Sequence, residues 1–390
     1  MPSFFPQTGD EPLKIAVFTS TRADSGILAP VARALAAMED VEVHALATGT
    51  HLNGQFGHTL EQELSEWGPL EIHEIPLGQE FLTEIETAKS LGVFQVHLAE
   101  TLASINPDSA VVLGDRTEAL AFAFSCSILG IPLIHLHGGE ISMGALDDNH
   151  RHAISKLSSL HFTSSEEASK RLQLMGENPT SISYFGSIAS DRIPHQPIFT
   201  KAKLAKQFGF SWGEKTAVVT MHGAKFDNPS TAAHLSALLT AVDRVEGLNV
   251  VFTGPNADPE SQQLRAMIVD YCKLHQSKAF FVESFGSQGY LDMLVHSDIA
   301  IGNSSSLIHE APLVGVPAVL VGSRQDGREG KDKTGTGADP KEIGNLISQK
   351  LSGPRPAKQT QPGSGSVATL IAKTIYAKSP IGLQKGFWTE

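Results

Sequence analysis

Residues 14–47, KIAVFTSTRADSGILAPVARALAAMEDVEVHALA, decide the fold of this chain. The run Lys14–Thr19 is rich in β-forming residues, and Gly26–Met38 repeats its apolar residues at helical spacing. Val41–Ala47 is a second β-rich run. A strand, a helix and a strand in this order predict a parallel βαβ unit with a right-handed crossover.

The same alternation continues along both halves of the chain. In the first half we expect further strands at Ser109–Leu113, Ile131–His135 and Leu160–Thr163, and helices at Thr87–Ile105, Glu118–Leu129 and His150–Ser158. In the second half we expect strands at Thr216–Met221, Asn249–Thr253, Ala279–Glu283, Asp298–Ile301 and Ala318–Val321, and helices at Thr231–Val245, Glu260–His275, Gly289–Val295 and Ser306–Val314. Repeated units of this kind predict an α/β protein with doubly wound parallel sheets.

The alternation stops around Gly186–Thr200, where two prolines indicate a linker. A chain of 390 residues is long enough for two domains of ordinary size, and we expect them at residues 1–195 and 196–365, with a cleft between them. Ser323–Pro340 is rich in glycine and charge and is expected to be a mobile loop. Pro354–Ser366 is a polar linker that leads to a last helix at Val367–Ala377.

Composition excludes several classes of protein. Hydrophobic residues make up 41% and charged residues 18% of the chain, which predicts a packed core. The formal net charge of −12 disfavours nucleic acid as a partner. Two cysteines are too few for a disulfide framework, which fits a reducing cytoplasm, and no segment approaches the roughly 20 apolar residues of a membrane span.

Polar side chains follow five of the expected strands, at the edge where parallel sheets bind their ligands. They are Ser20, Thr21, Arg22 and Asp24; Gly114, Asp115 and Arg116; His137, Gly138, Gly139 and Glu140; His222; and Gly302, Asn303, Ser304, Ser305 and Ser306. One such group would mean little, but five together indicate a functional site.

The segment Gly302–Ser306 leads from a strand directly into a helix. Small residues there let backbone N–H groups approach an anion at the helix terminus, although a serine N-cap without a ligand explains the segment equally well. Arg22 is a candidate to clamp the same phosphates from the other domain, or a surface ion pair.

Four carboxylates, Asp115, Glu140, Asp147 and Asp148, stand near strand ends or a helix start. Paired carboxylates can take and give protons, while the simpler reading of Asp147 and Asp148 is a helix cap and first turn. His135 and His137, two residues apart, would form a metal site with Glu140 only if the strand continued, and we expect no metal. His222 is the better catalytic candidate among the histidines.

The motifs together resemble the hydrolysing UDP-N-acetylglucosamine 2-epimerases. They are TSTRAD (Thr19–Asp24), GDR (Gly114–Arg116), HLHGGE (His135–Glu140), DDNHRHAISKLSSL (Asp147–Leu160), GNSSS (Gly302–Ser306) and GSRQDGRE (Gly322–Glu329). The resemblance runs from about residue 14 to 350 in consistent order. It implies a GT-B-like fold of two Rossmann-like domains, in which residues 366–390 form a C-terminal helix that packs back on the first domain.

The resemblance also implies roles for individual residues. Arg22, Ser304 and Ser305, in the segment that begins Gly302–Asn303, would hold the diphosphate, and Glu310 the uridine ribose. Asp115, Asp147 and Asp148 would serve C2 proton removal and C1 hydration, while His222 and Arg116 would support the departing phosphate. Arg324 and its loop would close over the nucleotide. His137 stands where the sialic-acid branch can carry an acidic base, so the choice of base among His137, Glu140 and the aspartates stays open.

The resemblance implies a reaction without a cofactor. UDP-N-acetylglucosamine, or a UDP-2,4-diacetamido-2,4,6-trideoxyhexose, would give UDP and the C2-inverted free sugar through a glycal, in a sialic or other nonulosonic acid pathway. The alternatives are a non-hydrolysing 2-epimerase, a GT-B glycosyltransferase and a catalytically inactive nucleotide-sugar sensor. We expect a homo-oligomer, a dimer or tetramer, with no membrane partner.

Overall fold

The computed structural model describes residues 11–52, 60, 64–77, 83–142, 146–193, 197–255, 260–328, 335–359 and 366–389, apart from the side chains of Arg22, Ala23 and Glu66. The chain divides into two compact units, each described by itself below. Unit 1 comprises Met1–Glu140, Asn149–Asp191 and Pro362–Glu390, and unit 2 comprises Ile141–Asp148 and Arg192–Gln361. The domain limits and the cleft expected from the sequence stay predictions.

Unit 1 is built on a seven-stranded sheet in which every neighbouring pair is parallel. Its order is β3-β2-β1-β4-β5-β6-β7. The strands are β1 (Leu13–Thr19), β2 (Val41–Ala47), β3 (Glu71–Glu74), β4 (Ser109–Leu113), β5 (Leu133–Leu136), β6 (Leu160–Thr163) and β7 (Ile182–Tyr184). The helices are α1 (Arg22–Ala36), α3 (Glu84–Ile105), α4 (Thr117–Leu129), α5 (Asp147–Leu157), α6 (Glu166–Leu174) and α14 (Val367–Lys378).

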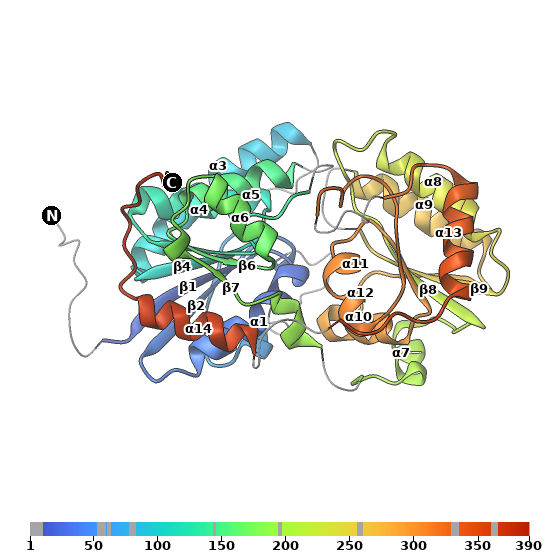
Figure 1. Ribbon diagram of the computed structural model, residues 1–390, viewed down its shortest axis with the longest axis horizontal. Helices are drawn as coiled ribbons and strands as arrows, with labels where there is room; N and C mark the ends of the chain where they lie inside the picture. Colours follow the sequence, from blue (N-terminus) through green and yellow to red (C-terminus); the bar gives the residue numbers. More distant parts are fainter. Residues whose placement is uncertain are drawn as a thin grey trace. The chain divides into compact units, whose positions relative to one another are not determined.

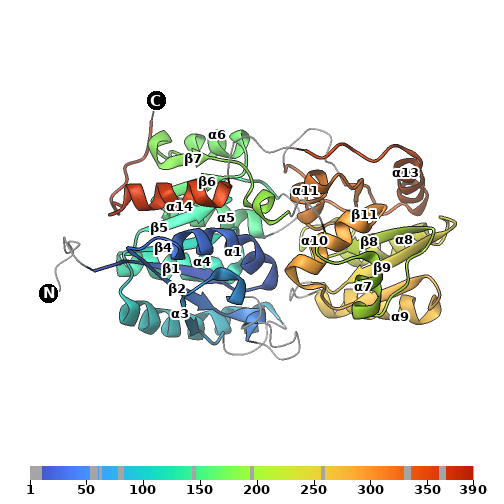
Figure 2. The ribbon, with the colours of Figure 1, turned by 90° about the horizontal axis from the view of Figure 1, so that it is seen from below.

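Alternate residues of β1 pack into two separate cores, one on each face of this sheet. Ile15 and Val17 pack in a cluster with α1 and with Ile371 of α14, and the red helix α14 lies beside α1 in both views (Figure 1, Figure 2). Ala16 and Phe18 pack on the opposite face, which α3 and α4 cover, and the ring of Phe18 stacks on that of Phe122 at 4.7 Å. A strand buried on both faces explains the nearly continuous apolar run in the sequence.

Unit 2 is built on a five-stranded parallel sheet with the order β10-β9-β8-β11-β12. The strands are β8 (Lys215–Thr220), β9 (Leu248–Thr253), β10 (Ala279–Val282), β11 (Ile299–Gly302) and β12 (Ala318–Leu320). The helices are α7 (Lys201–Phe208), α8 (Thr231–Val242), α9 (Ser261–Leu274), α10 (Gly286–His296), α11 (Ser306–His309), α12 (Ala311–Val314) and α13 (Pro340–Ser352). Two apolar clusters again fill the two faces of the sheet.

The predicted fold class is confirmed, because both units are doubly wound parallel α/β sheets. One predicted helix, Ser306–Val314, is wrong in detail: the structure has two four-residue helices, α11 and α12, that join at Glu310. The reason is Pro312 near the start of α12, since a proline has no N–H to donate within a helix. Within the described part of the chain, no helix is long and apolar enough to cross a membrane.

Candidate functional site

Both sheets have a topological switch point, where neighbouring strands send their connections to opposite faces. In unit 1 this point lies between β1 and β4, and in unit 2 it lies between β8 and β11. Open α/β sheets bind ligands outside the carboxyl ends of the strands at such a point. The segments that follow these four strands contain most of the candidate residues, which places them where each fold makes a ligand site.

In unit 1, the loop after β1 is organised by Asp24. Its carboxylate accepts hydrogen bonds from the backbone N–H groups of Ser20 and Thr21, at 2.9 and 2.7 Å, and from their hydroxyl groups. The N–H of Asp24 donates in return to the Thr21 hydroxyl, which completes a capping box. Arg22 is the first residue of the capped helix α1, and its side chain lies outside the described atoms.

Beside this loop, Arg151 ties Asp115 to the segment that contains Glu140. The Arg151 side chain is 1% exposed; it forms an ion pair with Asp115 and donates to the Glu140 carbonyl at 3.0 Å. The buried Glu140 carboxylate accepts from the Ser164 hydroxyl at 2.6 Å and lies 3.8 Å from Nδ1 of His137. Three predicted residues, Asp115, His137 and Glu140, thus share one hydrogen-bonded and ionic network.

His135 is a structural histidine. Its Nε2 donates to the Gly114 carbonyl at 2.8 Å, so its Nδ1 accepts from the Ser155 hydroxyl at 3.0 Å. Complete burial lowers the pKa of His135 to about 3, and the ring is neutral at every physiological pH. A Cβ on Gly138 would lie 2.7 Å from Nδ1 of His135, which explains the first glycine of HLHGGE.

His137 does not continue the strand. β5 ends at Leu136, and the backbone of His137 adopts a left-handed conformation with φ of +61°. The two histidines therefore do not share a face, and the arrangement required for a metal site with Glu140 is not formed. A left-handed histidine costs about 1–3 kcal/mol, and such strain is found most often at functional sites.

Arg116 is bound by a buried carboxylate. Its Nε donates to Glu118 at 2.7 Å, and Glu118 is 3% exposed. Burial alone would raise the pKa of Glu118, but the Arg116 charge and hydrogen bonds from Arg116 and Ser20 outweigh it, and the pKa is lowered. Glu118 thereby links the loop after β1 to the loop after β4.

In unit 2, the side chain of Asn303 holds the backbone of His222. Its Oδ1 accepts from the His222 N–H at 2.7 Å, and its Nδ2 donates to the His222 carbonyl at 2.8 Å. The side-chain amide thus continues the pairing of β8 and β11 beyond their last backbone hydrogen bonds. Gly302 precedes it with φ of +139°, and a Cβ there would lie 1.9 Å from the Thr220 carbonyl oxygen. The sequence predicted Asn303 as a substrate ligand; in the structure its amide positions His222.

Arg324 joins this group through the Asn303 carbonyl. Its Nη1 donates there at 3.3 Å, and Gln325 donates to the same oxygen at 2.7 Å. Nη2 of Arg324 lies 3.4 Å from Oδ2 of Asp147, which begins helix α5 and belongs to unit 2. The next residue, Asp148, accepts from the Ser142 N–H at 2.7 Å. Both aspartates lie in the first turn of α5.

The serines after β11 form a hydroxyl cluster. The Ser304 oxygen accepts from the Ser306 hydroxyl at 3.0 Å, and Ser306 lies 2.6 Å from the buried hydroxyl of Tyr290. Burial raises the pKa of Tyr290 to about 12, so this hydroxyl stays protonated. Ser305 stands at the N-cap position of α11, but its side chain makes no capping hydrogen bond. A four-residue helix has only a small dipole, so backbone N–H groups and hydroxyls are the donors for an anion. Glu310 lies 3.7 Å from the Arg192 guanidinium.

The sequence reasoning missed the partner residues of the site. They are Glu118, Arg151, Ser164, Arg192, Tyr290 and Gln325. Arg151 lies within the DDNHRHAISKLSSL motif, and a charged residue on the apolar side of an expected helix was the available signal. Tyr290 and Arg192 have no comparable signal, because their contacts depend on distant segments.

Three comparisons describe what this chain is similar to. The sequence matches the family described as UDP-N-acetylglucosamine 2-epimerase over residues 33–376. A Campylobacter jejuni protein named GDP/UDP-N,N'-diacetylbacillosamine 2-epimerase (hydrolyzing) is 33% identical over 315 residues, 81% of this chain and 82% of that protein. The Legionella pneumophila UDP-N,N'-diacetylbacillosamine 2-epimerase (hydrolyzing) is 32% identical over 319 residues, covering 82% and 83%.

Among solved structures, the Methanocaldococcus jannaschii UDP-GlcNAc 2-epimerase in complex with UDP-GlcNAc and UDP has a TM-score of 0.76. The alignment covers 94% of this chain and 100% of that chain at 18% identity. At this level of identity the similarity shows the fold.

Proposed function

The chain belongs to the UDP-N-acetylglucosamine 2-epimerase family, and we propose on this basis that it is a hydrolysing 2-epimerase of a UDP-linked 2-acetamido sugar. Its products are UDP and the free sugar with the C2 centre inverted. The observation that carries the proposal is the match to two relatives named as hydrolysing enzymes, each over about four-fifths of both chains.

The preferred substrate in this proposal is UDP-N,N'-diacetylbacillosamine, a UDP-2,4-diacetamido-2,4,6-trideoxyhexose. Both relatives carry this sugar in their names. UDP-N-acetylglucosamine is the second candidate, because the family is described by it. The free product would feed the biosynthesis of a nonulosonic acid. Both cysteines, Cys126 and Cys272, are free, the state that a reducing cytoplasm maintains.

The reaction begins with cleavage of the C1–O bond, because no carbonyl next to C2 acidifies the C2 proton. The electron pair of that bond leaves with UDP. The oxocarbenium-like sugar then loses its C2 proton to a carboxylate and becomes a glycal. Water adds its hydroxyl to C1, and a proton is delivered to the opposite face of C2.

We assign the proton transfers to the carboxylates. Asp115 is oriented by Arg151, and Asp147 by Arg324. His137 and Glu140 are candidates for the second proton, since they lie within 3.8 Å of each other in the same network as Asp115. Asp148 takes part through the first turn of α5, where it anchors the Ser142 backbone.

We assign the nucleotide to residues around β11 and to Arg22. Ser304 and Ser305, with the backbone of Gly302 and Asn303, would donate to the diphosphate. Arg324 and His222 would stabilise its charge as it leaves, and preorganised donors of this kind contribute most when the charge develops. Glu310 would accept from the ribose hydroxyls. Arg116 donates through Nε to Glu118, and its other guanidinium nitrogens would support the departing phosphate.

A proton NMR time course in D2O tests the proposal. UDP-N,N'-diacetylbacillosamine, its GDP counterpart and UDP-N-acetylglucosamine are incubated separately with the enzyme. We expect UDP and a C2-inverted, C2-deuterated free sugar from the first substrate. A UDP-linked epimer would instead identify a non-hydrolysing enzyme, and an unchanged C2 centre with transfer to an added acceptor would identify a glycosyltransferase. Binding of UDP without turnover of any substrate would identify a sensor.

We also propose that the enzyme is a homo-oligomer. The neighbouring helices α3 and α4 expose large apolar side chains: Val93 at 48%, Val96 at 57%, Phe124 at 48% and Ile128 at 71%. Light scattering on the purified protein should give a mass of at least two chains. The substitution Phe124→Asp should reduce it to one chain, whereas Leu274→Asp, at an 82% exposed position of α9, should not. A wild-type mass of one chain would refute the proposal.

A further inference from the structure

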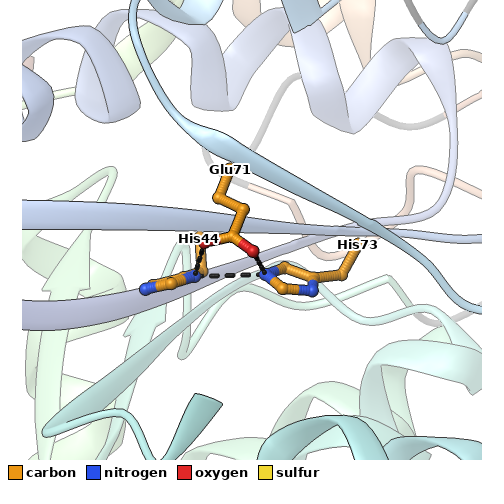
Figure 3. A group of neighbouring side chains, drawn as sticks. All are labelled: His44, Glu71 and His73. Atoms are coloured by element: carbon orange, nitrogen blue, oxygen red, sulfur yellow. Dashed lines mark hydrogen bonds and ion pairs between the residues drawn. The ribbon is translucent and has the colours of Figure 1, made fainter. Parts of the chain in front are cut away.

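Two histidines and a glutamate converge at one edge of the unit 1 sheet. His44 lies on β2, and Glu71 and His73 lie on the neighbouring edge strand β3. The parallel register pairs His44 with Glu71 and Leu46 with His73, which places all three side chains on one face. Figure 3 shows the Glu71 carboxylate and the His73 ring directed at the same nitrogen of His44.

The distances among these side chains match those between the ligands of one metal ion. Nδ1 of His44 lies 3.1 Å from Nε2 of His73. Oε2 of Glu71 lies 3.5 Å from Nδ1 of His44, and Oε1 of Glu71 lies 3.7 Å from Nε2 of His73. Ligand atoms of a tetrahedral zinc ion are about 3.3 Å apart, because each bond is about 2.0–2.1 Å long. Small adjustments of the exposed Glu71 side chain and of the His73 ring would therefore complete a three-ligand site.

A second carboxylate supports this arrangement. Oε1 of Glu42 lies 3.3 Å from Nε2 of His44, on the side of the ring that faces away from the cluster. The contact has the distance of an ion pair without the geometry of a hydrogen bond, and a negative charge there favours the proton on Nε2 and leaves the Nδ1 lone pair directed at the cluster. A small rotation of the Glu42 side chain would give the carboxylate–histidine hydrogen bond that is common at metal sites.

The charges around the cluster also favour a cation. His44 is 4% exposed, while Glu71 and Glu42 have side chains exposed by 60% and 41%. Within the described part of the chain, both glutamates form ion pairs with these histidines and with no lysine or arginine. The cluster therefore combines two imidazoles with two uncompensated carboxylates at an accessible edge.

We propose that His44, Glu71 and His73 bind a divalent transition-metal ion of the zinc class. Two imidazole nitrogens select Zn²⁺, Co²⁺ or Ni²⁺ over Mg²⁺ and Ca²⁺, which prefer oxygen ligands. His44 lies three residues before the end of β2, about 10 Å from the carboxyl edge of the sheet. The ion is thus a clamp that joins the short edge strand β3 to β2, and it takes no part in the chemistry of the sugar.

The test is a titration of tag-free, chelator-treated protein with Co²⁺, followed by visible absorption. We expect one Co²⁺ per chain, with the strong bands of a four-coordinate ion, and displacement by Zn²⁺. His73→Gln and Glu71→Gln, both on the exposed edge strand, should weaken binding by more than about 100-fold, and Glu42→Gln by about 10–100-fold. Circular dichroism of each variant would establish that it is folded.

The matched control is His275→Gln. His275 also faces a carboxylate, with Nδ1 3.7 Å from Asp243, but among the residues that the structure describes it belongs to no cluster of metal-binding side chains. The substitution should therefore leave the titration unchanged. Amide exchange of Glu71–Glu74 should slow when Zn²⁺ is added to wild type and not when it is added to His73→Gln. A wild-type protein without these bands, or a folded His73→Gln protein that binds like wild type, would show that the cluster is only a hydrogen-bonded histidine pair.

Discussion

The side chain of Arg151 connects three parts of unit 1: helix α5, the end of β4 through Asp115, and the Glu140 segment after β5. A guanidinium that is 1% exposed needs this carboxylate, because a buried charge without a partner costs several kcal/mol. The orientation of Asp115 therefore depends on a residue that is itself out of reach of a substrate. This explains why a basic residue occupies the inner side of α5.

Arg151→Met should consequently destabilise unit 1 and impair the enzyme together. We expect a loss of about 3 kcal/mol in the free energy of unfolding, measured with urea, since one member of a buried pair is removed. Turnover should fall by about 100-fold, because Asp115 loses its orientation. Arg171→Met is the control: Arg171 donates to the Gly139 carbonyl and pairs with no carboxylate among the described residues, so its loss should be smaller. Equal effects of the two substitutions would contradict the role of Arg151.

Asn303 has a comparable role in unit 2, where it determines the position of His222. Asn303→Ala removes two buried hydrogen bonds, one that the His222 N–H donates to the amide and one that the amide donates to the His222 carbonyl. We expect a loss of about 1–3 kcal/mol in unfolding free energy and a lower kcat with a nearly unchanged KM for the substrate. Asn249→Ala removes one exposed amide contact, to the Ser211 carbonyl, and should change neither quantity measurably.

At the scale of elements, the long buried strands and the helices between them could be predicted, because their apolar residues repeat with a clear period. β2, β4 and β6 have the predicted limits. β3 was missed, since its sequence EIHE is polar and it lies largely exposed at the edge of the sheet. α6, α7, α13 and β7 were missed too. The division into two short helices after β11 was not predicted, because the sequence does not show that Pro312 begins a new helix there.

The candidate site, too, could be predicted only in part from the sequence. Residues after strand ends could be predicted, because the topology of a parallel sheet determines where its ligands bind. Their partners could not, because a contact such as Tyr290 with Ser306 depends on the packing of separate elements. For the same reason the sequence predicted Asn303 as a substrate ligand but gave no sign of its two hydrogen bonds to the His222 backbone.

The segment after α14 is held by a group of charges centred on Glu177. The carboxylate of Glu177 is 1% exposed. Its Oε1 accepts from Lys156 at 2.6 Å, and its Oε2 accepts from Lys385 at 2.8 Å and contacts Nε2 of His161 at 3.1 Å. Burial alone would raise the pKa of Glu177, but these hydrogen bonds lower it to about 2. Lys385 also donates to the Ser158 carbonyl at 2.6 Å, which fastens the end of the chain to α5.

Acidification should release this segment. Because the pKa of Glu177 is lowered on folding, its contribution is complete above about pH 4.5 and is lost as pH falls from there toward 2. The contribution is roughly 3 kcal/mol. Glu177→Gln should therefore unfold more easily at pH 7 and show a flatter stability profile below pH 4.5 in urea titrations. Glu166→Gln, at an exposed position of α6, should retain the wild-type profile.

Each of the two units has cores of its own, and a core substitution should act on one unit. Ile371 of α14 and Ile347 of α13 are both fully buried, the first in unit 1 and the second in unit 2. Ile371→Ala should lower the unfolding free energy of unit 1, and Ile347→Ala that of unit 2, each by about 2–5 kcal/mol. Hydrogen exchange resolved by peptide would distinguish the two; faster exchange throughout both units in either variant would show that they unfold as one.

Helix α14 has a further consequence for how the chain matures. A ribosome synthesises every residue of unit 2 before it reaches Val367, whereas the apolar face of the first sheet needs α14 as its cover. The unit that begins first is thus the last to be complete, the reverse of the usual order in which domains finish during synthesis. Until translation has passed Lys378, the apolar face of α1 lacks the helix that packs on it, and we expect the nascent chain to bind chaperones during that interval.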